Sequence, residues 1–233
     1  MEKVIYLLWR DEKTSADEFC RNLRERAVPA LKKAGAMHVH LNLADADVAP
    51  AAALKQQHLK SPPDALVQLW VHSAIAHLRK PVDEALRPFA ARSAAYLVTA
   101  SQPLINQKHV PLPGERTHGF SQIALLRTPS RLSHAEWLDI WHNSHTIVAV
   151  ETQSTFEYIQ NVVVRTLTPD APKLDAIVEE SFPPEAMKDY KVFFDAPGDE
   201  AKMKKNLQRM MESVHRFIEP GTIDVIPTSQ YRV

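Results

Sequence analysis

Trp137, Trp141 and His145 combine aromatic and titratable side chains at a spacing of four residues. Residues four positions apart lie on the same face of an α-helix, so the three side chains are predicted to line up. An imidazole has an unperturbed pKa of about 6.5, and aromatic walls around it would keep it neutral and able to accept a proton. We therefore identify His145 as a candidate acid–base group and the two tryptophans as candidate substrate-binding residues. The alternative is a histidine that only hydrogen-bonds a backbone carbonyl at a helix end.

Tyr158 and Asn161 follow on the next predicted element, a strand. Their separation of three residues places them on opposite faces of a regular strand, so only a bulge would bring both into one pocket. We favour Tyr158 as the donor to a substrate oxygen and keep Asn161 as a second candidate; a tyrosine that only packs in the core is the alternative. Asp175, which opens a later strand, could orient His145 or cap a turn. The equivalent Asp64 in the first half has no histidine to orient, which favours the cap.

Other reactive residue types lack the partners that their chemistry needs. His38 and His40 share a face of a predicted strand, but no third ligand follows at a recognisable spacing, so a hydrogen-bonded or solvated pair is expected instead of a metal site. His142 and His145 lie three apart on a helix without the glutamate of a zinc-protease motif. Cys20 has no matching His and Asn pattern, and glycine-rich phosphate loops are absent. No cofactor is therefore predicted.

The charge balance narrows the choice of partner. The 28 lysines and arginines are matched by 28 aspartates and glutamates, and no long basic run occurs. A nucleic acid or an anionic membrane would find no electrostatic footprint on such a chain, so a small molecule is the expected partner. The first apolar stretch is too short for a secretory signal or a membrane span, and a single cysteine suits a reducing compartment. We therefore expect a cytoplasmic protein.

The elements that must position these side chains occur twice along the chain. Ser15 to Glu18 and Ser133 to Glu136 both have the capping-box pattern of a helix start, 118 residues apart. Each pattern follows an apolar strand that ends in arginine, and further strands come after each helix. The first half is predicted as strand 3–10, helix 16–34, strand 37–43, strand 64–73, helix 80–95 and strand 96–102. The second half is predicted as strand 119–127, helix 134–150, strand 155–166, strand 174–182, an interrupted helical region 184–218 and strand 222–229.

Each half thus reads as βαββαβ, a ferredoxin-like unit with a four-stranded antiparallel sheet and both helices on one face. The face of each sheet opposite its helices is apolar and must be buried. We therefore expect an α+β protein in which two such units, residues 1–112 and 113–233, pack sheet to sheet. A pocket should lie between each sheet and its own helices. The irregular segment 44–63, with a short helix at 51–58, is typical of a functional loop. A homodimer is a further hypothesis, since strand edges and the terminal segment 228–233 could add to a neighbour.

The second half resembles the EthD family of the dimeric α+β barrel superfamily. The match consists of the aromatic-x3-Trp-x3-His helix, the Tyr-x-Gln-Asn strand and the Asp-Gly-Ile-x-Glu-like strand, here Trp137-x3-Trp141-x3-His145, Tyr158-Ile-Gln-Asn161 and Asp175-Ala-Ile-Val-Glu179. The first half is more divergent, with Phe19-x3-Leu23-x3-Ala27 on the same helical face. The second half also departs from the family, since Thr146-Ile147 stands where Ala-Pro is usual and Val162 stands where a second histidine is frequent.

The resemblance implies a tandem α+β barrel more strongly than it implies a reaction. Together with His145 it suggests a cofactor-independent enzyme that acts on a small apolar carbonyl or phenolic compound, by dehydration, isomerisation, decarboxylation or oxygenation. Tyr158 or Asn161 would hold an oxygen. The alternatives are a non-catalytic ligand-binding or stress-related barrel and, less favoured, a haem-binding barrel. Because Ala27 stands where the repeat places His145, only one such site is expected in the chain.

Overall fold

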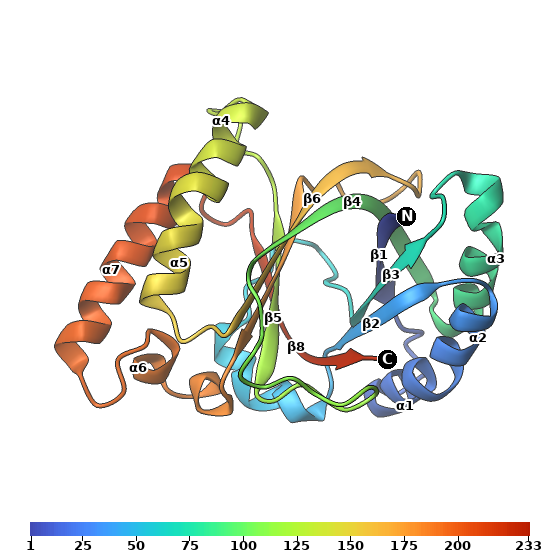
Figure 1. Ribbon diagram of the computed structural model, residues 1–233, viewed down its shortest axis with the longest axis horizontal. Coiled ribbons are helices and arrows are strands. Elements are labelled where there is room, and N and C mark those ends of the chain that lie inside the picture. The colour runs from blue at the N-terminus through green and yellow to red at the C-terminus, as the bar shows by residue number, and fades with distance from the viewer.

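Eight strands close into a barrel in the middle of the molecule (Figure 1). The computed structural model describes residues 1–233. The order around the barrel is β1-β3-β2-β8-β5-β7-β6-β4, and neighbouring strands are antiparallel. The strands are β1 (Glu2–Trp9), β2 (Met37–Leu43), β3 (Ala65–Val71), β4 (Arg92–Leu104), β5 (Phe120–Leu126), β6 (Glu157–Thr166), β7 (Ala176–Phe182) and β8 (Asp224–Arg232).

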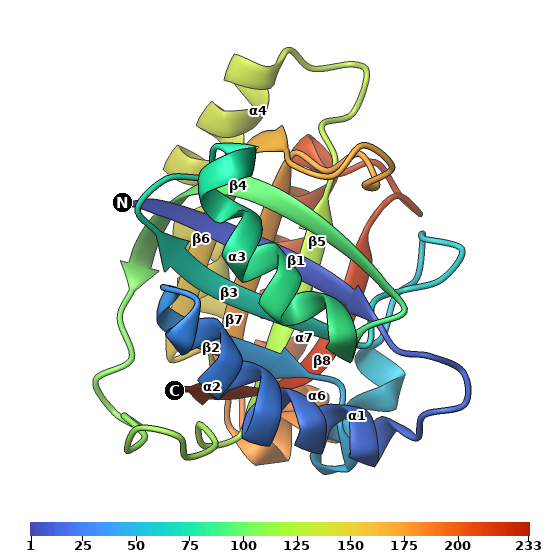
Figure 2. The same cartoon turned by 90° about the vertical axis from the view of Figure 1, so that its right-hand side faces the viewer.

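Helices cover the barrel on two opposite sides (Figure 1). The layer that faces the viewer in Figure 2 consists of α1 (Ala16–Asn22), α2 (Val28–Lys33) and α3 (Ala76–Leu86). The opposite layer consists of α4 (His134–Asp139), α5 (Thr146–Thr152), α6 (Tyr190–Phe193) and α7 (Glu200–Phe217). Short 3-10 helices are η2 (Ala46–Leu54), Arg87–Phe89 and Pro184–Met187. No helix combines the length and the apolar composition that crossing a bilayer requires.

The first helix of each half starts where its sequence predicts. Ser15 accepts a hydrogen bond from the backbone N–H of Glu18, and Ser133 accepts one from the N–H of Glu136. The Glu136 side chain also accepts from the Ser133 backbone N–H at 2.9 Å, which completes the capping box. These bonds satisfy N–H groups that the first turn of a helix leaves free.

Both of these helices contain a π-helical turn at the same place. The turns are Leu23–Ala27 in the first half and Ile140–His145 in the second. A π turn accommodates one extra residue and frequently occurs at functional sites. The α-helical direction resumes in α2 and α5, so the predicted helices 16–34 and 134–150 are each three helical segments.

The order of elements is βαββαβ in each half, apart from short additional helices. Strands of the first half lie in the order β4-β1-β3-β2, and those of the second half lie in the order β8-β5-β7-β6. Two seams close the barrel: β2 pairs with β8, and β4 pairs with β6. The C-terminal segment therefore pairs within its own chain and is not free to add to a neighbour, contrary to the expectation for residues 228–233.

The predicted boundaries fail most clearly in the second part of the first half. Helix 80–95 and strand 96–102 are observed as α3 (Ala76–Leu86) and β4 (Arg92–Leu104). Alanine has a high helix propensity, which favours a helix over residues 90–95 when the sequence is considered alone. Pro88 prevents the helix from continuing, and Ala94 and Ala95 pair with β1 instead. The short helix predicted at 51–58 is η2 (Ala46–Leu54), shifted toward the N-terminus.

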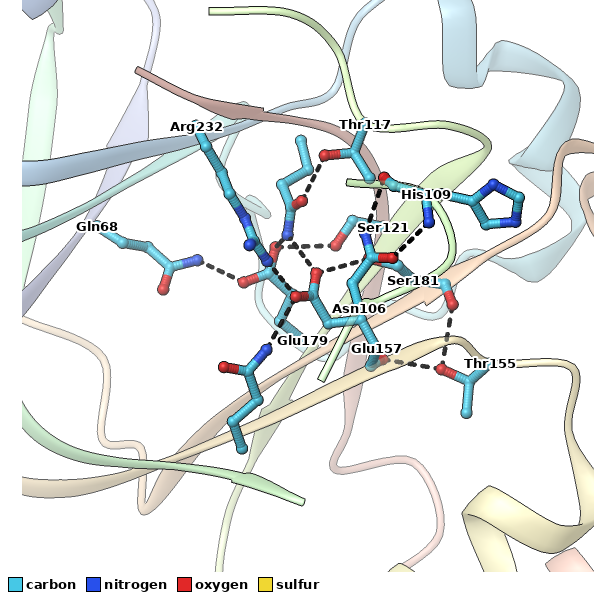
Figure 3. A network of polar contacts seen from close by, with 12 residues as sticks. Gln68, Asn106, His109, Thr117, Ser121, Thr155, Glu157, Glu179, Ser181 and Arg232 are labelled. Atoms are coloured by element: carbon cyan, nitrogen blue, oxygen red, sulfur yellow. Dashed lines mark hydrogen bonds and ion pairs between the residues drawn. The ribbon is translucent and has the colours of Figure 1, made fainter. Parts of the chain in front are cut away.

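Apolar side chains form one core beneath each helix layer and a third core inside the barrel. The barrel interior also contains a hydrogen-bonded polar network (Figure 3). Glu179 on β7 accepts hydrogen bonds from the side chains of Asn42, Gln68, Ser121 and Gln230. Because the first two belong to one half and the last two to the other, the network ties the halves together.

Candidate functional site

A cavity of about 430 Å³ lies beneath the helix layer of the second half. Its floor is formed by strands β5 to β8 and its roof by the π turn with α6 and α7, while η2 of the first half closes one side. Most of its 26 lining residues are hydrophobic. The polar ones are Gln56, Gln122, His145, Gln153, Tyr158, Glu180, Tyr190 and His215. Such a space suits a small, largely apolar molecule with few polar groups.

Three polar side chains form a row on the strand wall of this cavity. Gln122 on β5 lies opposite Glu180 on β7, and Glu180 lies opposite Tyr158 on β6. Residues directly opposite each other on antiparallel strands share a face, and their Cβ atoms lie about 5 Å apart. All three residues line the cavity, so amide, carboxyl and phenol groups converge on one edge of it.

Glu180 is the most unusual residue of the row. Its side chain is buried and makes no hydrogen bond or ion pair with the protein. Burial raises the pKa of the carboxyl from 4.5 to about 7, because the charged form loses its hydration. A carboxyl with this pKa can both accept and return a proton near neutral pH.

Tyr158 points into the cavity as the sequence predicted. Its hydroxyl oxygen accepts a hydrogen bond from the Trp141 indole N–H at 2.9 Å. Burial, followed by the charge of Glu180, raises the pKa of the phenol, so the hydroxyl keeps its proton. Since its oxygen is already engaged as an acceptor, the hydroxyl hydrogen is available for donation to a ligand oxygen.

His145 lies on the helical wall of the cavity. Its Nδ1 atom is 2.9 Å from Ser213 Oγ, and its ring packs on Phe217 with centroids 4.5 Å apart. Burial, with a smaller contribution from the charge of Arg216, lowers the pKa of the imidazole to about 4. The ring is therefore neutral near pH 7, as expected from its aromatic surroundings. With Nδ1 engaged, Nε2 is the nitrogen available to a ligand.

The π turn contains both Trp141 and His145 and is bonded to the neighbouring strand. The backbone N–H of Thr146 donates to the carbonyl of Trp141, five residues back. The Thr146 hydroxyl donates to the same carbonyl at 2.9 Å and accepts from Gln160 Nε2 at 2.8 Å. This bonding fixes the helix to β6, the strand that also carries Tyr158.

The remaining predicted site residues lie elsewhere. Trp137 is buried behind Trp141 and donates from Nε1 to the Phe217 carbonyl at 3.0 Å, without lining the cavity. Asn161 lies on the barrel side of β6, where its Oδ1 accepts from Lys3 Nζ at 2.7 Å. No bulge separates it from Tyr158 in the pairing with β7, so the two side chains face opposite ways. Asp175 accepts from the backbone N–H of Thr128 at 2.7 Å, the turn cap that was one of its two predicted roles.

The histidine pair of β2 packs on an indole. The rings of His38 and His40 both meet the Trp70 ring edge-on, at centroid distances of 5.8 and 5.9 Å. Burial is the main reason that the pKa of His40 falls to about 4. No three His, Cys, Asp or Glu side chains come together in the way that a metal site requires.

Sequence reasoning missed Glu180 and Gln122. The signal for Glu180 was the Glu179-Glu180 pair, which follows the apolar run Ala176 to Val178 of the same strand. Successive strand residues face opposite sides, so one of the two had to face the helices. The family pattern contains Glu179, which faces the barrel interior, and does not include Glu180.

Comparison with known proteins identifies the architecture. No protein-family model and no curated protein matches the chain in sequence. An anthrone oxidase-like protein matches in structure with a TM-score of 0.58 and 10% identity, over 100% of this chain and 91% of the other. The fold is that of a dimeric α+β barrel. Two monooxygenase-like proteins give lower scores, 0.49 for one from Fusobacterium nucleatum and 0.47 for one from Lactobacillus acidophilus. Their identities are 10% and 9%, and they cover 99% and 98% of this chain and 92% and 93% of their own.

Proposed function

We propose that this α+β barrel is an enzyme that acts on a small, largely apolar carbonyl or phenolic compound by proton transfer, without a bound cofactor. The observation that carries the proposal is the buried, unpartnered Glu180 carboxyl on the wall of an apolar cavity, beside Tyr158 and His145. An isolated polar group in such a place costs stability, and proteins commonly retain such groups where they act on a ligand.

The proposed division of labour follows from the protonation states. Glu180, with its pKa near 7, removes a proton from a phenol or from the carbon next to a carbonyl. Tyr158 donates its hydroxyl hydrogen to the oxygen on which negative charge then develops. His145, neutral near pH 7, exchanges a proton with the substrate through Nε2 while Ser213 holds the ring. Gln122 offers an amide beside Glu180 and orients the same edge of the substrate.

Anthrone is the first substrate to test, because a structurally similar protein is named anthrone oxidase-like. Deprotonation of its methylene carbon gives a carbanion that O2 oxidises, so each turnover consumes one O2 and yields anthraquinone and one water. We expect wild-type turnover and a loss of at least about 100-fold in Glu180→Gln. The matched control is Glu185→Gln, which removes an exposed carboxyl and should leave the rate unchanged. Wild-type turnover that persists in Glu180→Gln would refute the assignment.

A non-catalytic binding protein is the competing outcome of the same experiment. Fluorescence titration with 1-naphthol, an uncharged aromatic phenol, measures occupancy of the cavity independently of any reaction. Binding of 1-naphthol without turnover of anthrone or of the naphthol itself would favour a carrier role. The cavity is compatible with both outcomes, whereas the isolated Glu180 carboxyl favours the enzyme.

The lining residues fit a haem poorly. A haem carries two propionate groups, which proteins usually pair with arginine or lysine. No arginine or lysine is among the residues that line the cavity, and Glu180 adds a carboxyl to it. We therefore derive no step through a haem.

The same proposal includes the origin of the molecule. We infer that residues 1–112 and 113–233 are tandem ferredoxin-like repeats related to the EthD family. The supporting observations are the matched helix caps, the matched π turns and the identical strand orders of the two halves. The Trp141, His145 and Tyr158 pattern of the second half supports the closer relationship.

A further inference from the structure

Matching positions of the two halves carry very different side chains. Tyr6 lies opposite Val67 in the β1–β3 pair, and Ala124 lies opposite Val178 in the β5–β7 pair. The two valines end the corresponding segments Asp64-Ala-Leu-Val67 and Asp175-Ala-Ile-Val178. Tyr6 and Ala124 are therefore structural counterparts, and both point from their strands toward the helices of their own half.

In the first half the Tyr6 ring fills the space beneath the helices. The residue is only 2% exposed and belongs to the core formed with α1, α2 and α3. Its hydroxyl donates to Asp83 Oδ1 at 2.7 Å, and Arg79 Nε holds the same carboxylate at 3.0 Å. The position that Ala124 holds in the second half is thus occupied in the first half by an aromatic phenol of the protein itself.

The neighbouring row shows the same contrast. Val4 lies opposite Leu69 in the first half, and both are fully buried apolar residues. Their counterparts are Gln122 and Glu180, which line the cavity. Replacing a ring by the methyl group of Ala124 opens space, and replacing an apolar pair by Gln122 and Glu180 places polar groups beside it.

We propose that Ala124 sets the size of the aromatic ligand by leaving vacant the volume that the Tyr6 ring fills in the first half. The inference rests on the proposed function, because it concerns the ligand of the same cavity. A larger residue at position 124 should therefore weaken the binding of large aromatic ligands more than that of small ones. Ala124 acts by shape alone and takes no part in proton transfer.

The experiment compares two uncharged probes, 1-naphthol and phenol, in Ala124→Val and Ala124→Phe. Dissociation constants are measured by fluorescence titration of 1-naphthol and by its displacement with phenol. We expect Ala124→Val to weaken naphthol binding by about tenfold and phenol binding by less than about threefold. The two added methyl groups occupy space that the two-ring naphthol needs and the one-ring phenol does not. Ala124→Phe should abolish binding of both probes, since its ring repeats the packing of Tyr6.

The control is Ala176→Val, the same substitution at a buried β7 alanine of the same core that does not line the cavity. It should leave the ratio of the two dissociation constants unchanged. An unchanged ratio in Ala124→Val, or naphthol binding in a folded Ala124→Phe, would overturn the inference. If Ala124→Phe does not fold, the ratio in Ala124→Val decides. Wild-type protein that binds neither probe overturns it too, whereas wild-type binding without turnover contradicts only the enzymatic proposal.

Discussion

Glu179 and Glu180 are adjacent, both buried, and opposite in their electrostatics. Glu180 has no partner, and burial raises its pKa to about 7. For Glu179, burial acts in the same direction, but hydrogen bonds from Asn42, Gln230 and Gln68 outweigh it and lower the pKa. Glu180 lines the cavity, whereas Glu179 belongs to the network inside the barrel. They are separated because successive residues of a strand face opposite sides.

The first prediction concerns the pH dependence of stability in Glu180→Gln. The folded state favours protonated Glu180, so its contribution to the free energy of unfolding is lost as pH rises from 4.5 to about 7. The glutamine variant lacks this loss. We expect it to match the wild type near pH 4.5 and to exceed it by about 3 kcal/mol at pH 8. Urea unfolding across this range measures the difference, and a variant less stable than wild type at pH 8 would contradict the unpartnered carboxyl.

The second prediction concerns His145→Ala. Turnover should fall by at least about 100-fold because a proton-transfer group is lost. At pH 7 the free energy of unfolding should fall by only about 1 kcal/mol, the value of one hydrogen bond, since Ala27 occupies the matching helix position. The lowered pKa implies that wild-type stability is lost as pH falls from 6.5 toward 4, a loss that the alanine variant lacks. Parallel acid denaturation curves for the two proteins would argue against a buried neutral imidazole.

At the scale of elements, the π turn positions the site. Deleting the exposed Asn143 should convert the turn Ile140–His145 to α-helix and reduce the spacing of Trp141 and His145 from four residues to three, which displaces the indole relative to β6. We expect naphthol binding to fall by at least about tenfold, because the indole then leaves Tyr158. The matched control deletes the exposed Glu25 in the first-half turn Leu23–Ala27, which should lower the thermal midpoint but preserve the naphthol affinity. Equal effects of the two deletions on binding would refute a special role for the second turn.

Helix starts and strands that depend on short sequence patterns were predicted well. The capping serines Ser15 and Ser133 fixed both helix starts, and strand 37–43 was predicted at its observed bounds. The start of α3 was missed because the predicted helix began near Pro81, which the observed helix contains in its interior. The π turns were not predicted, because an extra residue in a helix leaves no distinct composition.

The site was only partly predictable for a related reason. His145, Trp141 and Tyr158 were found because aromatic and titratable residues at helical or strand spacing are conspicuous. Gln122 and the face of Glu180 were missed because β5 and β7 are buried on both faces, so hydrophobic alternation does not mark which side meets the helices. That assignment depends on pairing between strands far apart in the sequence.

At the scale of the whole molecule, the interior network joins the two halves. Glu179 accepts hydrogen bonds from both halves, and the charge of Lys3 also stabilises its carboxylate. We predict that Glu179→Gln lowers the free energy of unfolding by about 3 kcal/mol at pH 7, because donors and a buried cation lose their partner. Neighbouring Glu180→Gln should act in the opposite direction. Urea denaturation of both variants measures this, and the same sign of change in both would contradict the separation of the two strand faces.

The halves also complete each other's packing. Helix η2 of the first half packs on the core of the second and lines the cavity through Ala53 and Leu54 (light blue, below β5 in Figure 1). Conversely, Tyr231 of β8 in the second half packs in the core of the first half. The Arg24 guanidinium lies 5.1 Å from the centroid of the Tyr231 ring. Neither half can therefore be expected to provide the full site alone.

The last prediction follows from this exchange. A fragment of residues 113–233 has unpaired edges on β6 and β8, so it should associate with itself or aggregate, which size-exclusion chromatography detects. Even as a folded dimer it lacks η2, and we expect it to bind 1-naphthol at least about tenfold more weakly than the whole chain. Adding the fragment 1–112 should restore the affinity by re-forming the β2–β8 and β4–β6 seams. Full naphthol affinity in the isolated second fragment would show that the cavity needs nothing from the first half, and would reduce the first half to a cover for the barrel.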